Sequence, residues 1–449
     1  MVVLNPGFFL TIKEFAVKNR IAALLLPVCL ALALTTCFSP WAGDTATLIV
    51  SVGGAGNPRA LVQPGDIPGF NFELIVKGPG GTHRHNFTGT TAAIKVLPGK
   101  YQVSIIATNN VGALRALGER EVTVRGGSTP VGIEMFSATE VTDIYDLMAE
   151  ISFVNGGTRP EILVFKNGGS FTAPSQITIN RPIEIRAENP VTINLGASPS
   201  FLFSVSPDGE LTLKGHLTLD GGYDGYNTSN NASLIEVTGG TLTINNGVTL
   251  QNNYSGALGG AVWVRNNGTF TMEGGTICDN FTAQASGAVE IQNGTFTMKT
   301  GAVIANNKTN GDGGAVSLGN GTFNMLGGSI FNNTATGTFT NSLGYGGGVL
   351  VVFGTFNMTG GSISGNNAAD RGGGVYVLNS GNFIKKGNSI IYGNNGGTNA
   401  NTAGSGDGHA VLVYHSIEGN YKPKYRNDTS GAGDNISAVN NTFSGVWYP

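Results

Sequence analysis

The chain has 449 residues, of which 70 are glycine and only 12% are charged. Globular proteins average about 7% glycine and about 25% charged residues. A hydrophobic content of 40% excludes a disordered chain, and glycines without a three-residue period exclude collagen. The formal net charge of −3 does not indicate the excess of basic residues that is typical of nucleic-acid-binding proteins. At this length we expect two or three domains, or one repetitive architecture.

The N-terminus has the layout of an export signal. Three basic residues precede an apolar run over residues 21–34, which is too short for a typical membrane span. The run ends at Leu34-Thr35-Thr36-Cys37, which resembles the lipobox of bacterial lipoproteins, with a threonine where that family has Gly, Ala or Ser. The resemblance implies removal of residues 1–36 and a lipid on Cys37, which would anchor an exported protein to a bacterial membrane. Cleavage by an ordinary signal peptidase near Ala42 is the alternative.

Residues 45–137 are predicted to form a small β-sandwich. Short apolar or alternating segments are separated there by glycine and proline turns. These segments are 47–52, 70–76, 92–96, 101–107, 121–124 and 131–135. The run from Leu97 to Val103, Leu-Pro-Gly-Lys-Tyr-Gln-Val, resembles the hairpin of transthyretin-like and Ig-like modules, which implies their fold and no activity.

Residues 138–158 are predicted to be a linker that contains one helix, over 142–152. Apolar side chains recur there at the spacing of a single helical face. They are Ile144, Leu147, Met148 and Ile151. Thr142 with Asp143 supplies the N-cap region. We expect the helix to cover the first repeat of the segment that follows.

Residues 159–420 contain three signatures that recur with one period near 27 residues. They are Thr-Phe-x-Met, an apolar residue followed by x-x-Asn, and a glycine-rich approach to Val-x-Val. The markers are Phe270, Phe296, Phe323, Phe356 and Phe383; Asn253, Asn280, Asn307, Asn333, Asn366 and Asn394; and Val262, Val289, Val316, Val349, Val375 and Val411. We therefore predict about ten coils of three short strands, with Phe, Ile and Val inside.

The asparagines of this pattern are expected at the corners, because asparagine tolerates a left-handed backbone and its amide can bond along the stack. Two longer repeats carry insertions, at about 334–345 and 396–406. Insertions in solenoids project as loops and are the better candidates for contact with a partner.

Coils of this kind resemble the right-handed parallel β-helix of the pectate-lyase superfamily. The run Gly313-Gly314-Ala315-Val316 is similar to repeats of chlamydial polymorphic membrane proteins. The run from Gly360 to Ala368 is similar to coils of spirochaete (treponemal) surface proteins, as is the end from Tyr425 to Trp447. The resemblance covers residues 140–449 and implies a cell-surface location without an agreed activity. The predicted fold class is all-β: an Ig-like or transthyretin-like sandwich, a short capping helix and a parallel β-helix.

These features predict a non-enzymatic lipoprotein at the cell surface or outer membrane, acting as an adhesin or an envelope interaction scaffold. Its expected partners are the membrane, through the lipid, and a glycan or a host or envelope protein. The alternative is a carbohydrate-active enzyme, a polysaccharide lyase or glycosidase, or a carbohydrate-binding protein on the same fold. Such an enzyme needs clustered carboxylates, with or without Ca²⁺.

The acidic residues of the regular repeats do not stack on the period, so no catalytic, cofactor or metal residues are assigned. The densest polar group is His216, Asp220 and Asp224, which we retain as ligand or catalytic candidates. Turn chemistry is the main interpretation of Asp220. Asp312 and Asp370 occupy comparable turns two coils apart.

Other polar motifs are interpreted as ordinary surface. His83-Arg84-His85 could present two imidazoles to a metal, but no cysteine or carboxylate nearby completes a site. Gly404 to His409 is expected to be a flexible loop, and Ca²⁺ binding is its less favoured interpretation. Two short basic clusters are expected to be solvated. They are Lys385-Lys386 and Lys422, Lys424 and Arg426.

Residues 421–449 are predicted to cap the last coil. The segment lacks the repeat signatures and is rich in aromatic side chains that could cover unpaired backbone groups. They are Tyr421, Tyr425, Phe443, Trp447 and Tyr448. A sugar-stacking platform is the alternative interpretation of these rings.

Overall fold

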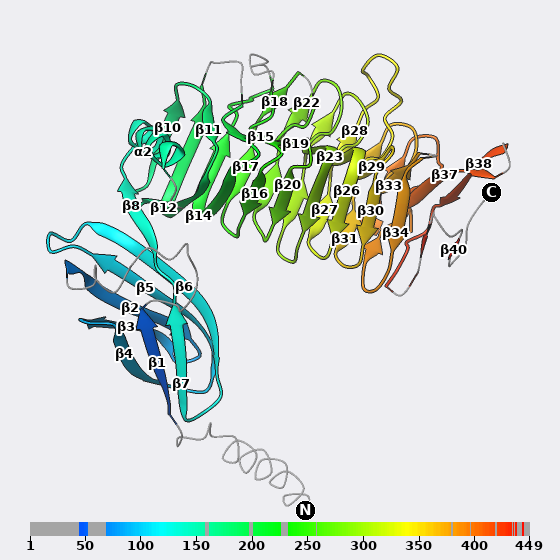
Figure 1. Ribbon diagram of the computed structural model, residues 1–449. Helices are drawn as coiled ribbons and strands as arrows, with labels where there is room; N and C mark the ends of the chain where they lie inside the picture. The colour runs from blue at the N-terminus through cyan, green and yellow to red at the C-terminus, as the bar shows by residue number, and fades with distance from the viewer. Residues whose placement is uncertain are drawn as a thin grey trace, which may run out of the picture.

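The computed structural model describes residues 45–52, 69–157, 161–196, 201–225, 232–256, 258–378, 380–395, 397–417, 420–432, 434, 436–437 and 442–443. Strands dominate these residues, which contain a single α-helix, so the prediction of a mostly β protein is confirmed. Figure 1 shows the N-terminal strands, in blue and cyan, as one unit, and the later strands as a long row lying side by side. The predicted export signal and Cys37 lie outside the described residues.

The N-terminal region consists of two sheets that share one apolar core. One sheet has the order β4-β1-β7, and the other contains β3-β2-β5-β6, paired antiparallel throughout. The strands are β1 (Ala46–Val52), β2 (Asn71–Gly78), β3 (Gly81–Phe87), β4 (Thr91–Val96), β5 (Gly99–Thr108), β6 (Leu114–Val124) and β7 (Ser128–Ile133). Alternation sets this core, because every second residue of β1 and of β5 is buried. Tyr101 begins the buried series in β5, and its hydroxyl donates to the Leu97 carbonyl at 2.8 Å.

Strand β8 (Phe136–Val141) joins the N-terminal region to the repeats. It pairs antiparallel with β6 and parallel with β9 (Glu161–Phe165), so one hydrogen-bonded sheet continues from one part of the molecule to the other. The stretch that we expected to be a linker therefore begins with a strand. It continues as α2 (Ile144–Gly156), whose N-cap Asp143 accepts hydrogen bonds from the N–H groups of Tyr145 and Asp146. The buried face of α2 is the predicted one, with Val154 added to it.

The repeats build four ladders of parallel strands, not the three that the sequence suggested. The Phe ladder contains β9, β12 (Pro182–Leu195), β14 (Glu210–Asp220), β16 (Thr241–Ile244), β20 (Thr269–Met272), β23 (Val289–Met298), β26 (Val316–Met325), β30 (Thr355–Met358) and β34 (Asn382–Lys385). The Ile ladder shares the long strands β12 and β14 with the Phe ladder. Its other strands are β10 (Gly169–Ala173), β17 (Thr249–Gln251), β21 (Thr276–Cys278), β24 (Val303–Ala305), β27 (Ser329–Phe331), β31 (Ser362–Ser364) and β35 (Ile390–Ile391).

The other two ladders complete each repeat. The Val ladder adds β11 (Ile177–Ile179), β13 (Phe203–Val205), β15 (Ile235–Thr238), β19 (Val262–Arg265), β29 (Val349–Val351), β33 (Val375–Val377) and β37 (Val411–Ile417). The short ladder, which we did not predict, consists of β18 (Tyr254–Ser255), β22 (Phe281–Thr282), β25 (Lys308–Thr309), β28 (Thr334–Ala335), β32 (Asn367–Ala368) and β36 (Thr402–Ala403). Its two-residue strands are too short to show a pattern in the sequence.

The marker phenylalanines stack inside the repeats, as predicted. The ring centroids of Phe270, Phe296, Phe323 and Phe356 follow one another at 4.7 Å, with interplanar angles of at most 9°. Phe383 continues the stack at 5.1 Å. The stacking of each phenylalanine on its equivalent therefore fixes the strand register between neighbouring repeats.

A ladder of buried asparagines follows the Ile ladder. Its members are Asn253, Asn280, Asn307, Asn333, Asn366 and Asn401. The last of these corrects the prediction of Asn394, which is exposed, because extra residues separate Ile391 from Asn401. The left-handed backbone also lies one position earlier than expected, as at Asn306 with φ 58°. The ladder asparagines are therefore selected for their amides and not for their backbone conformation.

The two insertions lie at slightly different places from those predicted. In the first long repeat, β28 ends at Ala335 and the extra residues follow it, before β29. Asp312 accepts hydrogen bonds from the N–H groups of Gly344 and Tyr345 at 2.8 and 2.7 Å and so holds this loop. In the last long repeat, the extra residues lie between Ile391 and Asn401.

Antiparallel strands terminate the stack at its C-terminal end. Strand β38 (Asn420–Arg426) pairs with β37, and β39 (Ile436–Ser437) pairs with both β34 and β40 (Thr442–Phe443). Ser430 bridges Ile391 at the end of the Ile ladder. His409 ends the short ladder, because its Nδ1 accepts the N–H of Ala403 at 3.1 Å. The side chains of Tyr421, Tyr425, Phe443, Trp447 and Tyr448 lie outside the described residues.

Two basic residues at this end correct the expectation of solvated clusters. Lys385 is fully buried at an inner position of the Phe ladder, and its amine donates to the carbonyls of Gly431 and Asp434 at 2.8 and 3.3 Å. Arg426 is also buried, and its guanidinium pairs with Asp434 at 2.9 Å. At the opposite end, the Asn155 side chain of α2 bonds to the backbone of β11 and of the residue after it.

Candidate functional site

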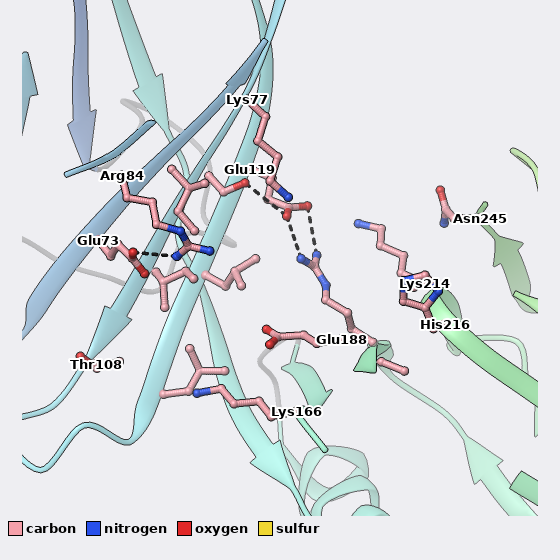
Figure 2. A pocket seen from close by; sticks show the side chains of 18 of the residues that line it. Glu73, Lys77, Arg84, Thr108, Glu119, Lys166, Glu188, Lys214, His216 and Asn245 are labelled. Carbon is pink, nitrogen blue, oxygen red and sulfur yellow. Dashed lines mark hydrogen bonds and ion pairs between the residues drawn. The ribbon is translucent and has the colours of Figure 1, made fainter. Parts of the chain in front are cut away.

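A cleft of about 800 Å³ lies between the N-terminal sheet and the first repeats (Figure 2). Strands β2, β3, β5 and β6 form one wall, and β12, β14 and the residues that follow β9 and β16 form the other. The N-terminal wall contributes the apolar side chains of Ile75, Ile106, Leu114 and Leu117, and charged groups surround them. Ligand sites of this size are common between domains.

An ion pair joins the two walls of this cleft. The Arg186 guanidinium on β12 binds the Glu119 carboxylate on β6 through two bonds, at 2.7 and 3.1 Å (Figure 2). Burial opposes ionisation of both groups. The Arg186 hydrogen bond and charge nevertheless lower the pKa of Glu119, and the bonds to Glu119 and Glu184 raise the pKa of Arg186. A bidentate pair of this kind fixes the orientation of one wall against the other.

His216 is the one predicted site residue that lines this cleft. It is exposed on β14 and lies beside Lys214, whose amine pairs with Glu184 at 2.7 Å (Figure 2). Asp220 follows four residues later on the same strand, about 13 Å away at the rise of an extended chain. The structure therefore does not bring the predicted trio together into one site.

Asp220 has a structural role in the turn that follows β14. One carboxylate oxygen accepts the N–H of Gly222 at 2.8 Å. The other oxygen accepts hydrogen bonds from the side-chain amides of Gln251 and Asn252, at 2.8 and 3.0 Å. The geometry matches the turn interpretation and also ties this turn to the next repeat. Asp224 is exposed beyond the turn.

A polar cluster on the outer side of the Val ladder was not predicted from the sequence. Strand register places Trp263 between Glu236 and Glu290 on three neighbouring strands. Glu236 forms an ion pair with Arg265, whose guanidinium lies 4.5 Å from the centre of the Trp263 ring. The sequence signal was the shared middle position of Val-x-Val, which alternates with the inner valines.

Glu290 is only 3% exposed, because the glycine-rich approach of each repeat folds over the outer side of this ladder. Ser286 replaces the left-handed glycine of neighbouring repeats, with φ 60°, and its hydroxyl donates to the Glu290 carboxylate. Burial raises the pKa of Glu290 to about 7, although hydrogen bonds from Ser286, Ser317 and Gln292 oppose the shift. A carboxyl group of this kind changes its charge near neutral pH.

The remaining sequence candidates do not assemble into a centre. His83 and His85 lie on β3, an edge strand whose one partner among the described strands is β2, which agrees with the interpretation as exposed surface, and Arg84 between them pairs with Glu73 at 2.7 Å. In the part of the chain that the structure describes, no three His, Cys, Asp or Glu side chains are grouped to hold a metal ion.

None of the helices among the described residues is long and apolar enough to cross a membrane. Comparison of the chain with protein-family models, with curated protein sequences and with solved structures found no match.

Proposed function

We propose that the repeats form a right-handed parallel β-helix and that residues 45–137 form an Ig-like sandwich. Four ladders of parallel strands with one period support the first assignment, since crossovers between parallel strands are almost always right-handed. Two sheets enclosing a common core support the second. The sandwich then acts as a spacer between the membrane and the β-helix.

The function that we infer is that of a non-enzymatic surface lipoprotein, an adhesin or envelope scaffold anchored through Cys37. The observation that carries this proposal is the use of acidic side chains in internal bonds. Asp220 holds a turn, Glu119 holds the two walls of the cleft together, and Asp312 holds an insertion loop. The repeats meanwhile offer a long, regular outer surface, which suits binding.

The test uses the mature chain on arrays of glycans and of envelope and matrix proteins. We expect retention of a partner without chemical change. Samples of uronate polymers and neutral polysaccharides are then incubated with the protein and assayed for reducing ends and unsaturated products. Turnover of any polymer would contradict the non-enzymatic proposal.

Anchoring is tested separately. We expect Cys37→Ala to abolish fatty-acid labelling and to leave the precursor unprocessed, because the lipidated thiol precedes cleavage of the signal. Cys29→Ala, inside the apolar run, is the matched control and should be labelled normally. Normal processing of the Cys37→Ala protein would show that the threonine before it defeats the lipobox.

One observation favours a glycosidase as the second candidate. Glu236 and Glu290 lie two strands apart, so their backbones are separated by roughly 9–10 Å. Paired carboxyl groups separated by about 6.5–9.5 Å serve inverting glycosidases. Both side chains are nearly buried, however, and Glu236 is bound to Arg265. Loss of any detected hydrolysis in Glu290→Gln would establish this alternative.

A further inference from the structure

The outer side of the Phe ladder carries two parallel rows of short polar side chains. Residues on either side of each marker phenylalanine point outward, because side chains alternate along a strand. The first row is Thr241, Thr269, Thr295, Thr322 and Thr355, and the second is Thr243, Thr271, Thr297, Asn324 and Asn357. We call this surface the threonine face. All ten side chains are partly exposed.

The spacing of the threonine face is regular and rigid. Neighbouring strands lie about 4.8 Å apart, and the two rows are separated by roughly 6.6 Å along each strand. The stacked rings beneath, at 4.7 Å, keep this spacing from repeat to repeat. Threonine is β-branched and stiff at χ1, so its hydroxyl positions are restricted in advance.

The threonine hydroxyls of this face are available for binding. Among the described residues, none of the eight threonine side chains in the two rows has a hydrogen-bond partner. Thr309 and Thr336, on other faces of the same repeats, donate to backbone carbonyls. Each free hydroxyl can donate one hydrogen bond and accept two.

The face is also electrically neutral. Neither row contains an ionisable side chain between β16 and β30. In the neighbouring outward row, Glu273 and Lys299 neutralise each other across adjacent strands at 2.6 Å. The amide of Asn357 donates to Asn324 at 2.9 Å, which leaves further amide atoms for an outside partner. A neutral, hydrogen-bonding ligand suits this surface better than an ion.

We propose that the threonine face binds a neutral, extended polysaccharide that lies along the axis of the stack. This inference rests on the proposed function of a non-enzymatic binding scaffold and names its ligand class. An unbranched polymer with a short axial repeat meets the same hydroxyl groups at every repeat of the protein. Asparagines in the second row supply amide donors and acceptors that suit sugar hydroxyls. Beyond β16 the second row continues through Thr212 and Glu184, and the first row through Glu210, beside a smaller hollow between the first repeats and β8.

The experiment measures sedimentation of the full mature chain with particles of cellulose, chitin and an insoluble β-1,3-glucan. The test variant is Thr271→Val with Thr297→Val, which removes two hydroxyls and keeps shape and strand propensity. The matched control is Thr249→Val with Thr276→Val, outward positions on the adjacent Ile ladder. We expect the wild type and the control to bind at least one polymer equally, and the test variant to bind roughly tenfold more weakly. Equal melting temperatures show that the test variant is folded.

Several results would overturn this inference. Absence of wild-type binding to all three polymers would do so, as would unchanged binding of the test variant. Growth inhibition of ice crystals without retention on polysaccharide would assign the rows to an ice lattice instead. Retention on an envelope or matrix protein with no dependence on the two threonines would leave the scaffold function intact and would exclude a glycan as the ligand of the threonine face. Turnover of a polymer whose binding depends on the two threonines would instead refute the non-enzymatic function and keep the face as a glycan site.

Discussion

The asparagine ladder and the threonine face repeat with the same period but lie in different surroundings. The ladder and each row of the threonine face place one short polar side chain on every repeat, about 4.8 Å from its neighbour. The asparagines are buried and bond to one another, whereas the threonines are partly exposed and have no partner within the described chain. The difference teaches that periodicity identifies a ladder, and that burial decides whether the ladder supports the fold or is free to bind.

Asn307 illustrates the inner case. Its amide nitrogen donates to Asn333 and to the carbonyls of Ile277 and Ala305, at 2.9 to 3.1 Å. Its amide oxygen accepts hydrogen bonds from the backbone and the side chain of Asn280, at 3.1 and 2.9 Å. The side chain therefore satisfies polar groups of three successive repeats at once.

The largest effect is expected for Asn307→Ala. The substitution removes the side-chain donor from two buried carbonyls and leaves the buried N–H of Asn280 without its acceptor, so we expect a loss of roughly 3–6 kcal/mol in the free energy of unfolding. Urea denaturation monitored by circular dichroism measures it. Asn320→Ala is the control, because Asn320 makes a similar amide bond, to Asn293 at 2.6 Å, on the exposed surface. Equal losses in the two proteins would remove the distinction between inner and outer amides.

Phe323→Ala tests the core that holds both ladders in register. Removal of one ring from the stack should cost roughly 3–5 kcal/mol, if the cavity does not collapse. Asn324→Ala, one residue later and outward-facing, should cost far less. Comparable unfolding midpoints for the two variants would show that the assigned strand phase is wrong.

Glu290 provides a buried polar group whose charge can be changed by pH. Its folded pKa of about 7 lies above the ordinary glutamate value of 4.5, so folding favours the neutral form. The contribution of Glu290 to stability is therefore greatest below about pH 4.5, falls as pH rises toward 7, and has lost on the order of 3 kcal/mol above that. Glu290→Gln should remove this dependence in urea titrations between pH 4 and 9. Glu273→Gln, at a partly exposed ion pair, should keep it. The same pH profile in wild type and Glu290→Gln would disprove the assignment.

The smallest effect on folding is expected for the threonine face itself. Thr271→Val with Thr297→Val breaks no internal bond and keeps β-branched side chains, so we expect unfolding midpoints within about 0.5 kcal/mol of the wild type. Calorimetry is sufficient for this comparison. A larger loss would indicate that the hydroxyls support the fold and belong with the asparagines.

The sequence predicted the inside of the repeats better than their corners. Phe, Ile and Val fell at the expected inner positions because burial imposes a strict period on them. Asn394 has the spacing of the corner asparagines, but the asparagine that belongs to the buried ladder is Asn401, which follows an insertion. The run Asn401-Thr402-Ala403 matches Asn333-Thr334-Ala335 and could have identified it.

Features that depend on tertiary packing were not predictable in the same way. Strand β3 is polar along most of its length, so it shows no alternation. The cleft brings together β6 and β12, which are distant in sequence and meet only because β8 joins the two parts. His216 could be selected as polar, but its separation from Asp220 became evident only from the strand that carries both. Glu236 and Glu290 required knowledge of the segment that covers them.

Lys385 has a consequence for how the chain avoids mis-threading. Like repeats at constant spacing create a near-translational symmetry, in which a chain slipped by one repeat would still place Phe on Phe. Lys385 breaks that symmetry, because it occupies the inner position that is methionine in the four preceding repeats. In a slipped stack its ammonium group would be enclosed away from the carbonyls of Gly431 and Asp434, and burying an unpaired charge is strongly unfavourable. One lysine therefore specifies which repeat is the last.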